Sequence, residues 1–278
     1  MRHLFHNWNV IQKRIRQARK VYLFFDYDGT LTPIVSQPEL AVCPPEVKEH
    51  LAQMRDSPRV FVGIISGRSL EDLYGRIGVP GITYVGNHGL EIRNPFGNHK
   101  KNLSVGRQKE MTLIAKALKT ALGNLPGILF EDKNVTLAIH YRLVSKACHE
   151  RIFQKMEKVV RKWGKKWRVT PGKMVFEVQP RADFHKGKAI RKLLKAVPSQ
   201  GLLPFYFGDD QTDEDAFRFL GGKGITVFVG PPEKASEAEF FLDDPAEVNE
   251  FIRRFIKSWP EDASAAQKSE GREKKMVQ

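Results

Sequence analysis

The stretch FFDYDGTLT, residues 24–32, decides the fold, because it ends an apolar run and at once places two carboxylates, Asp26 and Asp28. Side chains two residues apart on a strand point to the same side. A strand through Val21 and Phe25 would therefore aim both carboxylates into one cleft, and Gly29 would let the chain turn away. The same letters also occur in ordinary turns with capping acids, so the neighbouring motifs must decide between the two interpretations.

A second acidic stretch follows another apolar run, from Leu202 to Phe207. GDDQTDEDAF, residues 208–217, supplies five acids within seven positions and leads into apolar residues at helical spacing. A solvated surface alone does not explain acids in that position. Hard divalent cations such as Mg²⁺ prefer oxygen ligands, so two acidic strand ends that face each other predict a Mg²⁺ site.

Two further stretches could hold a phosphate group. The apolar run at 60–65 ends in Ser66-Gly67-Arg68, which offers a hydroxyl, a flexible backbone and a guanidinium. Lys186, in FHKGKAI, begins a predicted helix, where the ammonium and the helix N-terminus would both stabilise negative charge. Singly, Ser66 could be a helix cap and Lys186 a surface lysine, but the four motifs in this order favour a phosphate site.

The motifs DYDGTLT, SGR, HKGKA and GDDQTDEDAF resemble the four ordered motifs of haloacid-dehalogenase-like phosphatases. GNHGLEI at 86–92, LAIHYR at 137–142 and GKMVFEVQPR at 172–181 are similar to stretches of the trehalose-6-phosphate phosphatase branch. The resemblance spans most of residues 20–245. The catalytic motifs imply the type of reaction, and the shorter stretches imply the sugar.

The resemblance implies a mechanism. Asp26 would attack the phosphate to give an aspartyl-phosphate, and Asp28 would protonate the leaving oxygen and later activate water. Ser66 and Lys186 would hold phosphoryl oxygens. Mg²⁺ would be held by the Asp26 carboxylate, the Asp28 backbone carbonyl and Asp209, with Asp210 and Asp213 in supporting positions.

Apolar runs at 21–25, 60–65, 82–85, 203–207, 225–229 and 239–242 alternate with helical patterns, which predicts an α/β fold with a Rossmann-like parallel-sheet core. Residues 104–180 interrupt this alternation, with helices expected at 107–123 and 146–164, and predict an inserted α/β cap. The resemblance implies that this cap is a mobile lid. We expect a catalytic core at 21–103 and 181–260, a basic N-terminal helix in 1–20, packed on it through Leu4, Trp8, Ile11 and Ile15, and a disordered tail at 261–278.

Polar residues of the cap are expected to set the sugar specificity, because carboxylates and lysines suit ligands rich in hydroxyl groups. Residues of the core that face the cap would complete the substrate site. The candidates for substrate binding are Arg68, His88, Gly89, Glu131, Lys133, His140, Arg142, Lys173 and Glu177.

Composition limits the setting. The chain has 278 residues, no apolar run long enough for a transmembrane segment and no signal-peptide pattern. Only Cys43 and Cys148 are present, so a disulfide framework or a zinc site is not expected, and a reducing, cytoplasmic location fits best. A monomer is expected, with association with a trehalose-6-phosphate synthase as an open prediction.

The net charge of +14 is unevenly distributed, since residues 100–180 hold eighteen Lys/Arg against six acids. A basic segment beside an acidic metal site would draw in a phosphorylated substrate. The rival interpretation is nucleic-acid binding through Lys155 to Arg168, where Trp163 and Trp167 are interleaved. No nucleic-acid motif accompanies this charge, so no nucleic-acid partner is predicted.

The motifs predict a Mg²⁺-dependent phosphatase, and the resemblance implies that it converts trehalose 6-phosphate to trehalose and phosphate, the last step of trehalose biosynthesis. One alternative is a phosphatase with the same core and another sugar phosphate, such as sucrose phosphate, glucosylglycerol phosphate or mannosylphosphoglycerate. A second is a non-enzymatic module that binds polyanions or regulates a synthase. Such a module would be expected to lack Asp26 or Asp28, and both are present.

Overall fold

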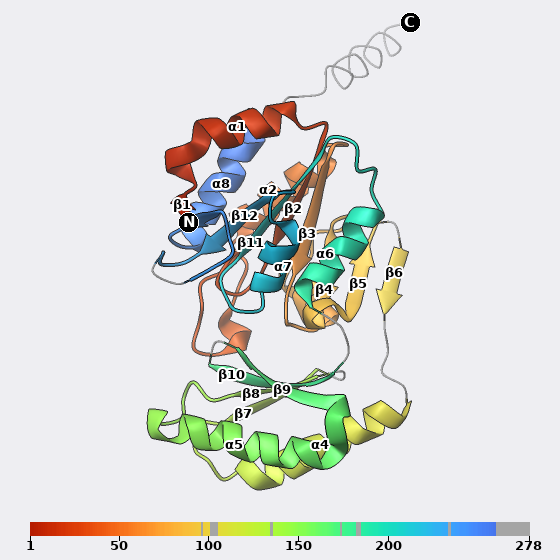
Figure 1. Cartoon of the computed structure of the whole chain (residues 1–278), viewed down its shortest axis with the longest axis vertical. Coiled ribbons are helices and arrows are strands. Elements are labelled where there is room, and N and C mark those ends of the chain that lie inside the picture. The colour runs from red at the N-terminus through yellow and green to blue at the C-terminus, as the bar shows by residue number, and fades with distance from the viewer. Residues whose placement is uncertain are drawn as a thin grey trace, which may run out of the picture.

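The computed structural model describes residues 1–95, 97–100, 105–133, 136–172, 174–181, 185–232 and 235–259. They form two parts, each built on its own sheet: one of nine strands, at the top of Figure 1, and one of four, at the bottom. The predicted α/β fold with a mostly parallel central sheet is confirmed. The tail predicted at 261–278 lies outside the described residues.

The large sheet has the strand order β1-β13-β12-β11-β2-β3-β4-β5-β6. In this order, each strand from β1 through β13, β12, β11, β2 and β3 to β4 pairs in parallel with the next. Strands β5 and β6 continue the sheet as an antiparallel hairpin, which the sequence pattern did not predict. The strands are β1 (Arg2–His3), β2 (Lys20–Phe25), β3 (Val60–Ile65), β4 (Thr83–Gly86), β5 (Glu91–Asn94), β6 (Gly97–Lys100), β11 (Leu202–Gly208), β12 (Ile225–Val229) and β13 (Phe240–Leu242).

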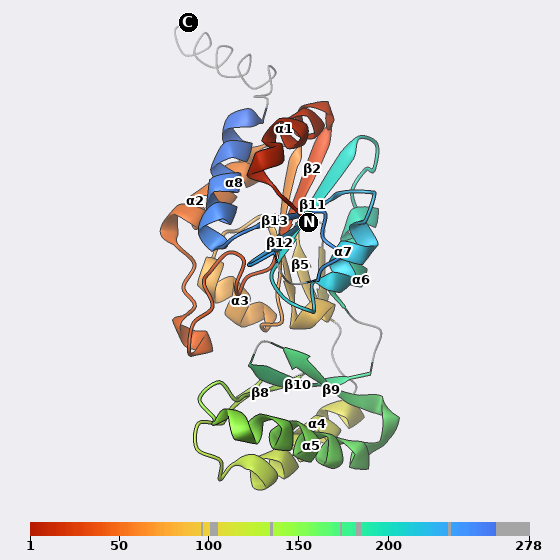
Figure 2. The same ribbon diagram turned by 60° about the vertical axis from the view of Figure 1, so that its left-hand side comes forward.

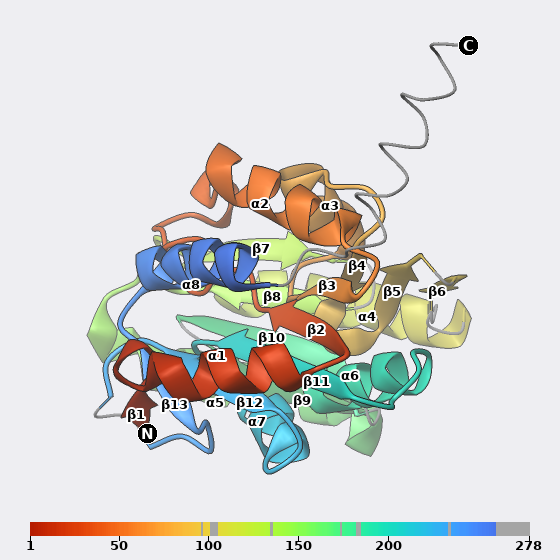
Figure 3. The same ribbon diagram turned by 90° about the horizontal axis from the view of Figure 1, so that it is seen from above.

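Helices cover both faces of this sheet, as Figure 3 shows from above. One face carries α1 (Trp8–Gln17), α2 (Pro45–Asp56), α3 (Leu70–Ile77) and α8 (Pro245–Ser258). The other carries α6 (Lys186–Lys195) and α7 (Glu214–Leu220). A parallel sheet covered on both faces explains why its strands read as continuous apolar runs rather than as alternating ones.

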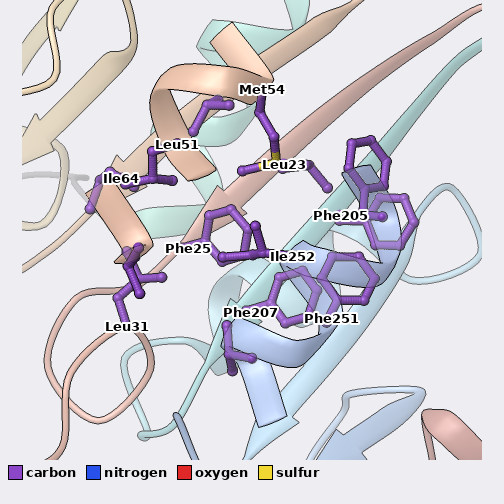
Figure 4. Packing of buried hydrophobic residues seen from close by; sticks show 14 of the residues in the cluster. Leu23, Phe25, Leu31, Leu51, Met54, Ile64, Phe205, Phe207, Phe251 and Ile252 are labelled. Atoms are coloured by element: carbon purple, nitrogen blue, oxygen red, sulfur yellow. The ribbon is translucent and has the colours of Figure 1, made fainter. Parts of the chain in front are cut away.

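Strand β2 divides its side chains between the two faces. Val21, Leu23 and Phe25 enter the cluster under α2 and α8, while Tyr22 and Phe24 enter the one under α6 and α7. Figure 4 shows the first cluster, where aromatic rings of β11 and α8 pack beside Leu23 and Phe25. Side chains on both faces of β2 are therefore held in hydrophobic clusters. This fixes the register of the strand and so the direction in which the chain continues after Phe25.

The N-terminal segment packs on the core, as expected. Leu4, Ile11 and Ile15 are fully buried, and Trp8 packs against the same cluster. The helix is shorter than residues 1–20, because Arg2 and His3 form β1 and pair with β13 at the edge of the sheet.

The cap sheet consists of β7 (Leu129–Asp132), β8 (Leu137–His140), β9 (Trp167–Gly172) and β10 (Val175–Pro180), in the order β7-β8-β10-β9 with every pair antiparallel. One face is turned to the core, and α4 (Val105–Leu122) and α5 (His149–Val160) cover the other, as Figure 2 shows. The prediction of one continuous helix at 146–164 is wrong. Turns of 3₁₀ helix flank α5 at Lys146–Cys148 and Arg161–Lys166, and the chain bends at Gly164 with φ of 75°.

None of the helices in the described part of the chain is long and apolar enough to cross a membrane.

Replacing Phe251 by alanine should lower the free energy of unfolding by about 3–5 kcal/mol, because its buried ring contacts Phe205, Phe207 and Phe255. Urea denaturation followed by fluorescence measures this. The control Leu113→Ala, at a side chain 56% exposed, should change the value by less than about 0.5 kcal/mol. A loss below about 1 kcal/mol at Phe251 would contradict this account of the core.

Candidate active site

The carboxyl ends of β2, β3 and β11 lie side by side, and each is followed by a predicted site residue. Asp26 follows β2, Ser66 follows β3 and Asp209 follows β11. Since β2 pairs in parallel with both of its neighbours, the three residues meet at one edge of the sheet. The sequence motifs therefore converge in space.

A pocket lies between this edge and the cap sheet. Most of the predicted site residues line it: Asp26, Asp28, Ser66, Arg68, His88, Glu131, Lys133, His140, Arg142, Glu177, Lys186, Asp209 and Asp210. Asp213 and Gly89 are not among its lining residues, and Lys173 lies outside the described part of the chain.

The turn after β2 brings the two acidic strand ends together. Gly29 has φ of +86°, and a Cβ atom there would lie 2.1 Å from Oδ2 of Asp209. Any side chain at position 29 would thus displace Asp209 as well as strain the backbone. Glycine is required here for the close approach of the two strand ends.

Lys186 is buried at the start of α6 and binds two carboxylates. Its Nζ lies 3.0 Å from Oδ1 of Asp26 and 2.6 Å from Oδ1 of Asp213. Its side chain is 2% exposed, so these contacts are screened little by water. The ammonium therefore holds the carboxylate of Asp26 in one place.

Asp213 contacts Lys186 but does not line the pocket, whereas Asp26 does. Its Oδ2 accepts the backbone N–H groups of Asp209 and Asp210, each at 3.0 Å. Its Oδ1 accepts the hydroxyl of Tyr206 at 2.6 Å in addition to Lys186. Asp213 thus organises the acidic loop and the lysine, which fits the supporting position expected for it.

Tyr206 is a site residue that the motifs did not indicate. The only signal in the sequence is a hydroxyl-bearing residue inside the apolar run of β11, which is also common in ordinary cores.

The electrostatics of the pocket floor suit a divalent cation. Burial raises the pKa of Asp26 well above its usual value, and the Lys186 ammonium only partly opposes this. The carboxylates of Asp213, Asp209 and Asp210 raise the pKa of Asp26 further. Oxygens of Asp26, Asp209 and Asp213 lie within 4.8 Å of one another. An oxygen-rich cluster with excess negative charge is the donor set that Mg²⁺ prefers, so these residues fit the metal.

Asp28 and Arg68 form a two-pronged ion pair at the pocket. Nε of Arg68 donates to Oδ2 of Asp28, and Nη2 donates to Oδ1, both at 2.7 Å. The SGR motif predicts that Arg68 binds substrate, but in the structure most of its donors are directed to the carboxylates of Asp28 and Asp72 and to the carbonyl of Pro38. Oγ of Ser66 accepts the backbone N–H of Arg68 at 3.1 Å, which ties the SGR turn together.

The cap contributes a buried ionic cluster that crosses to the core. Glu177 accepts from Lys133 Nζ at 3.1 Å and from the hydroxyl of Thr136 at 3.0 Å, and its Oε2 lies 2.7 Å from His88 Nε2. Lys133 also donates to the carbonyl of Gly67 at 2.8 Å. Burial alone would raise the pKa of Glu177, but Lys133 and His88 outweigh it and hold that pKa far below its usual value.

The remaining cap candidates also face the pocket. Nε2 of His140 lies 2.9 Å from Oε2 of Glu131, and Arg142 donates to the carbonyl of Val35 in the core. Gly89 has another use. With φ of +112°, it lets the chain pass α6, where a Cβ would lie 3.3 Å from Ala189 Cβ.

The aromatic residues that favoured nucleic-acid binding point into the cap. Trp167 is 2% exposed and donates from Nε1 to Glu110, while Trp163 packs against the hydrophobic cluster of the cap. The buried ring of Trp167 therefore offers no face on which bases could stack.

The chain is similar in sequence to known trehalose-phosphate phosphatases. The model of the trehalose-phosphatase family matches residues 24–246. The trehalose-phosphate phosphatase of Mycobacterium tuberculosis is 37% identical over 249 residues, which cover 86% of this chain and 62% of that protein. That of Mycobacterium marinum is 39% identical over 241 residues, which cover 84% and 60%. The chain thus spans about three fifths of the length of these relatives.

The structure of the chain is also similar to solved structures of trehalose-6-phosphate phosphatases. The C-terminal domain of C. albicans trehalose-6-phosphate phosphatase has a TM-score of 0.76 at 26% identity and covers 90% of this chain and 97% of that one. The Aspergillus fumigatus trehalose-6-phosphate phosphatase has a TM-score of 0.63 at 30% identity, with 89% and 96% covered. The C-terminal domain of the Candida albicans trehalose synthase regulatory protein, at 16% identity and a TM-score of 0.67 with 89% and 97% covered, shares the fold alone.

The family match begins at the strand that carries Asp26 and ends beyond the acidic loop of Asp209, so it contains the whole pocket. On this match, the chain belongs to the trehalose-phosphatase family.

Proposed function

We propose that this chain hydrolyses trehalose 6-phosphate to trehalose and phosphate with Mg²⁺. One observation carries the proposal: the buried Asp26 carboxylate, held 3.0 Å from Lys186 and grouped with Asp209, forms the floor of a pocket roofed by polar cap residues. Such a floor suits a phosphoryl group, and such a roof suits a sugar. The family match supports the choice of this sugar phosphate.

The first step is attack of an Asp26 carboxylate oxygen on phosphorus. The new bond joins Asp26 to phosphorus, the bond from phosphorus to the sugar oxygen breaks, and Asp28 gives that oxygen a proton. In the second step Asp28 takes a proton from water, whose oxygen attacks the phosphorus, and the carboxylate of Asp26 is released. The proton lost in the first step is thereby restored.

Charge is handled by residues at the ends of the three strands. Ser66 and Lys186 would bind phosphoryl oxygens, and Lys186 also restrains the nucleophile. Mg²⁺ would be held by the Asp26 carboxylate, the Asp28 carbonyl and Asp209, with support from Asp210 and Asp213. When bound, it would offset the carboxylate charge and polarise the phosphoryl group.

Hydroxyl groups of the sugar would meet the cap side of the pocket. Glu131 and His140 form one polar pair there, and Lys133 and Glu177 form another. Charged hydrogen bonds to hydroxyl groups discriminate strongly between ligands, because a mismatched sugar leaves them unpaired. We therefore propose that these residues select the sugar while the floor performs the chemistry.

We also propose a cytoplasmic location, which the two free cysteines, Cys43 and Cys148, support. A monomer, and association with a trehalose-6-phosphate synthase, stay predictions. Light scattering and co-purification with the synthase would test them.

The direct test of the proposal is phosphate release, with Mg²⁺, from trehalose 6-phosphate and from a panel of other sugar phosphates. The panel contains sucrose 6-phosphate, glucose 6-phosphate, glucosylglycerol phosphate and mannosylphosphoglycerate. We expect the highest kcat/KM for trehalose 6-phosphate, by at least about tenfold, because one lost charged hydrogen bond has about this effect. A preference for another member would contradict the sugar, and no release from any member would contradict the enzyme.

Asp26→Asn should lower kcat by more than about a thousandfold, because the amide cannot act as the nucleophile. The control Asp56→Asn makes the same chemical change at an exposed residue of α2 and should keep wild-type turnover. Both are measured as Mg²⁺-dependent phosphate release, with circular dichroism to show that each variant folds. Full turnover by Asp26→Asn would rule out this mechanism.

Mg²⁺ should raise the thermal midpoint of the wild-type protein, because binding to the folded state alone contributes about 2.7 kcal/mol at a concentration of 100 Kd. Asp209→Asn should lose most of this shift, whereas Asp56→Asn should retain it. Differential scanning calorimetry with and without Mg²⁺ measures the effect without any turnover. An unchanged shift in Asp209→Asn would remove Asp209 from the metal site.

A further inference from the structure

A line of alternating charges leads from the surface of α3 to Asp28. At its outer end, Nε of Arg76 donates to both oxygens of Asp72, at 2.9 and 2.8 Å. Asp72 Oδ2 then accepts from Nη1 of Arg68 at 2.8 Å. Arg68 in turn holds Asp28 with the two bonds of 2.7 Å described above.

The middle of this line is buried and geometrically constrained. The Arg68 residue is 6% exposed, and its planar guanidinium is bound on one side by Asp28 and on the other by Asp72. A planar fork with fixed partners on two sides has little freedom to rotate. The direction in which Arg68 presents Asp28 to the pocket is therefore set by Asp72.

Arg76 also holds the segment that lies over Arg68. Its Nη1 donates to the carbonyls of Glu39, at 3.1 Å, and Ala41, at 2.9 Å. Nη2 of Arg68 donates to the carbonyl of Pro38, at 2.9 Å, in the same segment. Both arginines thus bind the backbone of residues 38–41, so the line is braced along its length.

We infer that Asp72 and Arg76 are positioning residues for Asp28 and act on it through Arg68. The inference rests on the proposed function, in which Asp28 transfers the proton to the leaving sugar oxygen. Neither residue lines the pocket, so neither is expected to touch the substrate. Their substitution should therefore change the proton transfer and leave substrate binding intact.

Leaving-group chemistry makes this separable from a loss of stability. A sugar alkoxide is a poor leaving group and needs a proton from a group within about 2.6–3.2 Å. An aryl oxide such as p-nitrophenolate leaves without this help. A misplaced Asp28 should therefore slow the first step, phosphoryl transfer to Asp26, for the sugar phosphate and not for the aryl phosphate, whereas hydrolysis of the phosphoenzyme is common to both substrates. A loosened fold would slow the first step with both substrates.

The test compares trehalose 6-phosphate with p-nitrophenyl phosphate for Asp72→Asn and Arg76→Ala, well below the thermal midpoint of each variant. The rate compared is that of the first turnover, read by rapid quench as release of trehalose or nitrophenolate, because it reports phosphoryl transfer to Asp26 alone. We expect this rate to fall about tenfold for trehalose 6-phosphate, and the substrate concentration at its half-maximum to change less than about twofold, since small displacements of a catalytic group have effects of this order or larger. The first-turnover rate for p-nitrophenyl phosphate should fall less than about twofold. Arg76, at the outer end of the line, keeps the test open if Asp72→Asn does not fold.

Arg161→Ala is the matched control. Arg161 donates to Glu157 at 2.8 Å with the same spacing of four residues, on the cap. Its removal should leave the ratio of the two first-turnover rates unchanged.

Asp28→Asn separates failure of the inference from failure of the proposed function. If Asp28→Asn slows the first turnover of trehalose 6-phosphate selectively while Asp72→Asn and Arg76→Ala keep the wild-type ratio of first-turnover rates, the inference is wrong and the proposed function stands. Equal slowing of the first turnover with both substrates in these two variants would also overturn it, because that indicates a structural role. If Asp28→Asn itself shows no selectivity in the first turnover, the proton transfer assigned to Asp28 is wrong, and the inference falls with it.

Discussion

The ion pairs of the buried Lys186 ammonium with Asp26 and Asp213 are the interaction on which the pocket depends. Carboxyl groups at the ends of two neighbouring strands would repel one another in a site that excludes water. Lys186 opposes that repulsion through its ion pairs with Asp26 and Asp213. The backbone N–H groups of Asp209 and Asp210, which donate to Asp213, oppose it as well. The remaining negative charge is what a divalent cation would offset, so the arrangement joins the fold, the proposed metal site and the proposed nucleophile in one cluster.

The pocket divides its tasks between two sheets. The mostly parallel sheet supplies the floor, with the strand ends proposed to carry the phosphate chemistry, and the antiparallel cap sheet supplies charged side chains above it. Lys133 and Glu177 of the cap bind Gly67 and His88 of the core, so the two parts are joined through the residues proposed to recognise the sugar. Substrate recognition and closure of the cap would then draw on the same contacts.

The central strands, and the meeting of Asp26, Ser66 and Asp209 at one edge of the sheet, could be predicted from the sequence, because buried parallel strands leave apolar runs and these residues directly follow them. Other features depend on partners distant in the sequence. The pairing of β1 with β13 and the contact of Tyr206 with Asp213 leave no local pattern. The pairing of Arg68 with Asp28 could not be read from the SGR motif, which indicates a guanidinium but not its direction. The break of the cap helix at Gly164 follows from a backbone angle that a single glycine permits but does not require.

The identity of the phosphorylated group tests the central claim most directly. Asp28→Asn, with Mg²⁺ and p-nitrophenyl phosphate, should form the phosphoenzyme without needing an acid but hydrolyse it slowly, because the base is missing. Rapid acid quench followed by peptide mapping in a mass spectrometer should place the phosphoryl group on Asp26. Phosphate on another residue, or nitrophenolate release in many turnovers with no phosphorylated peptide at any quench time, would contradict the account.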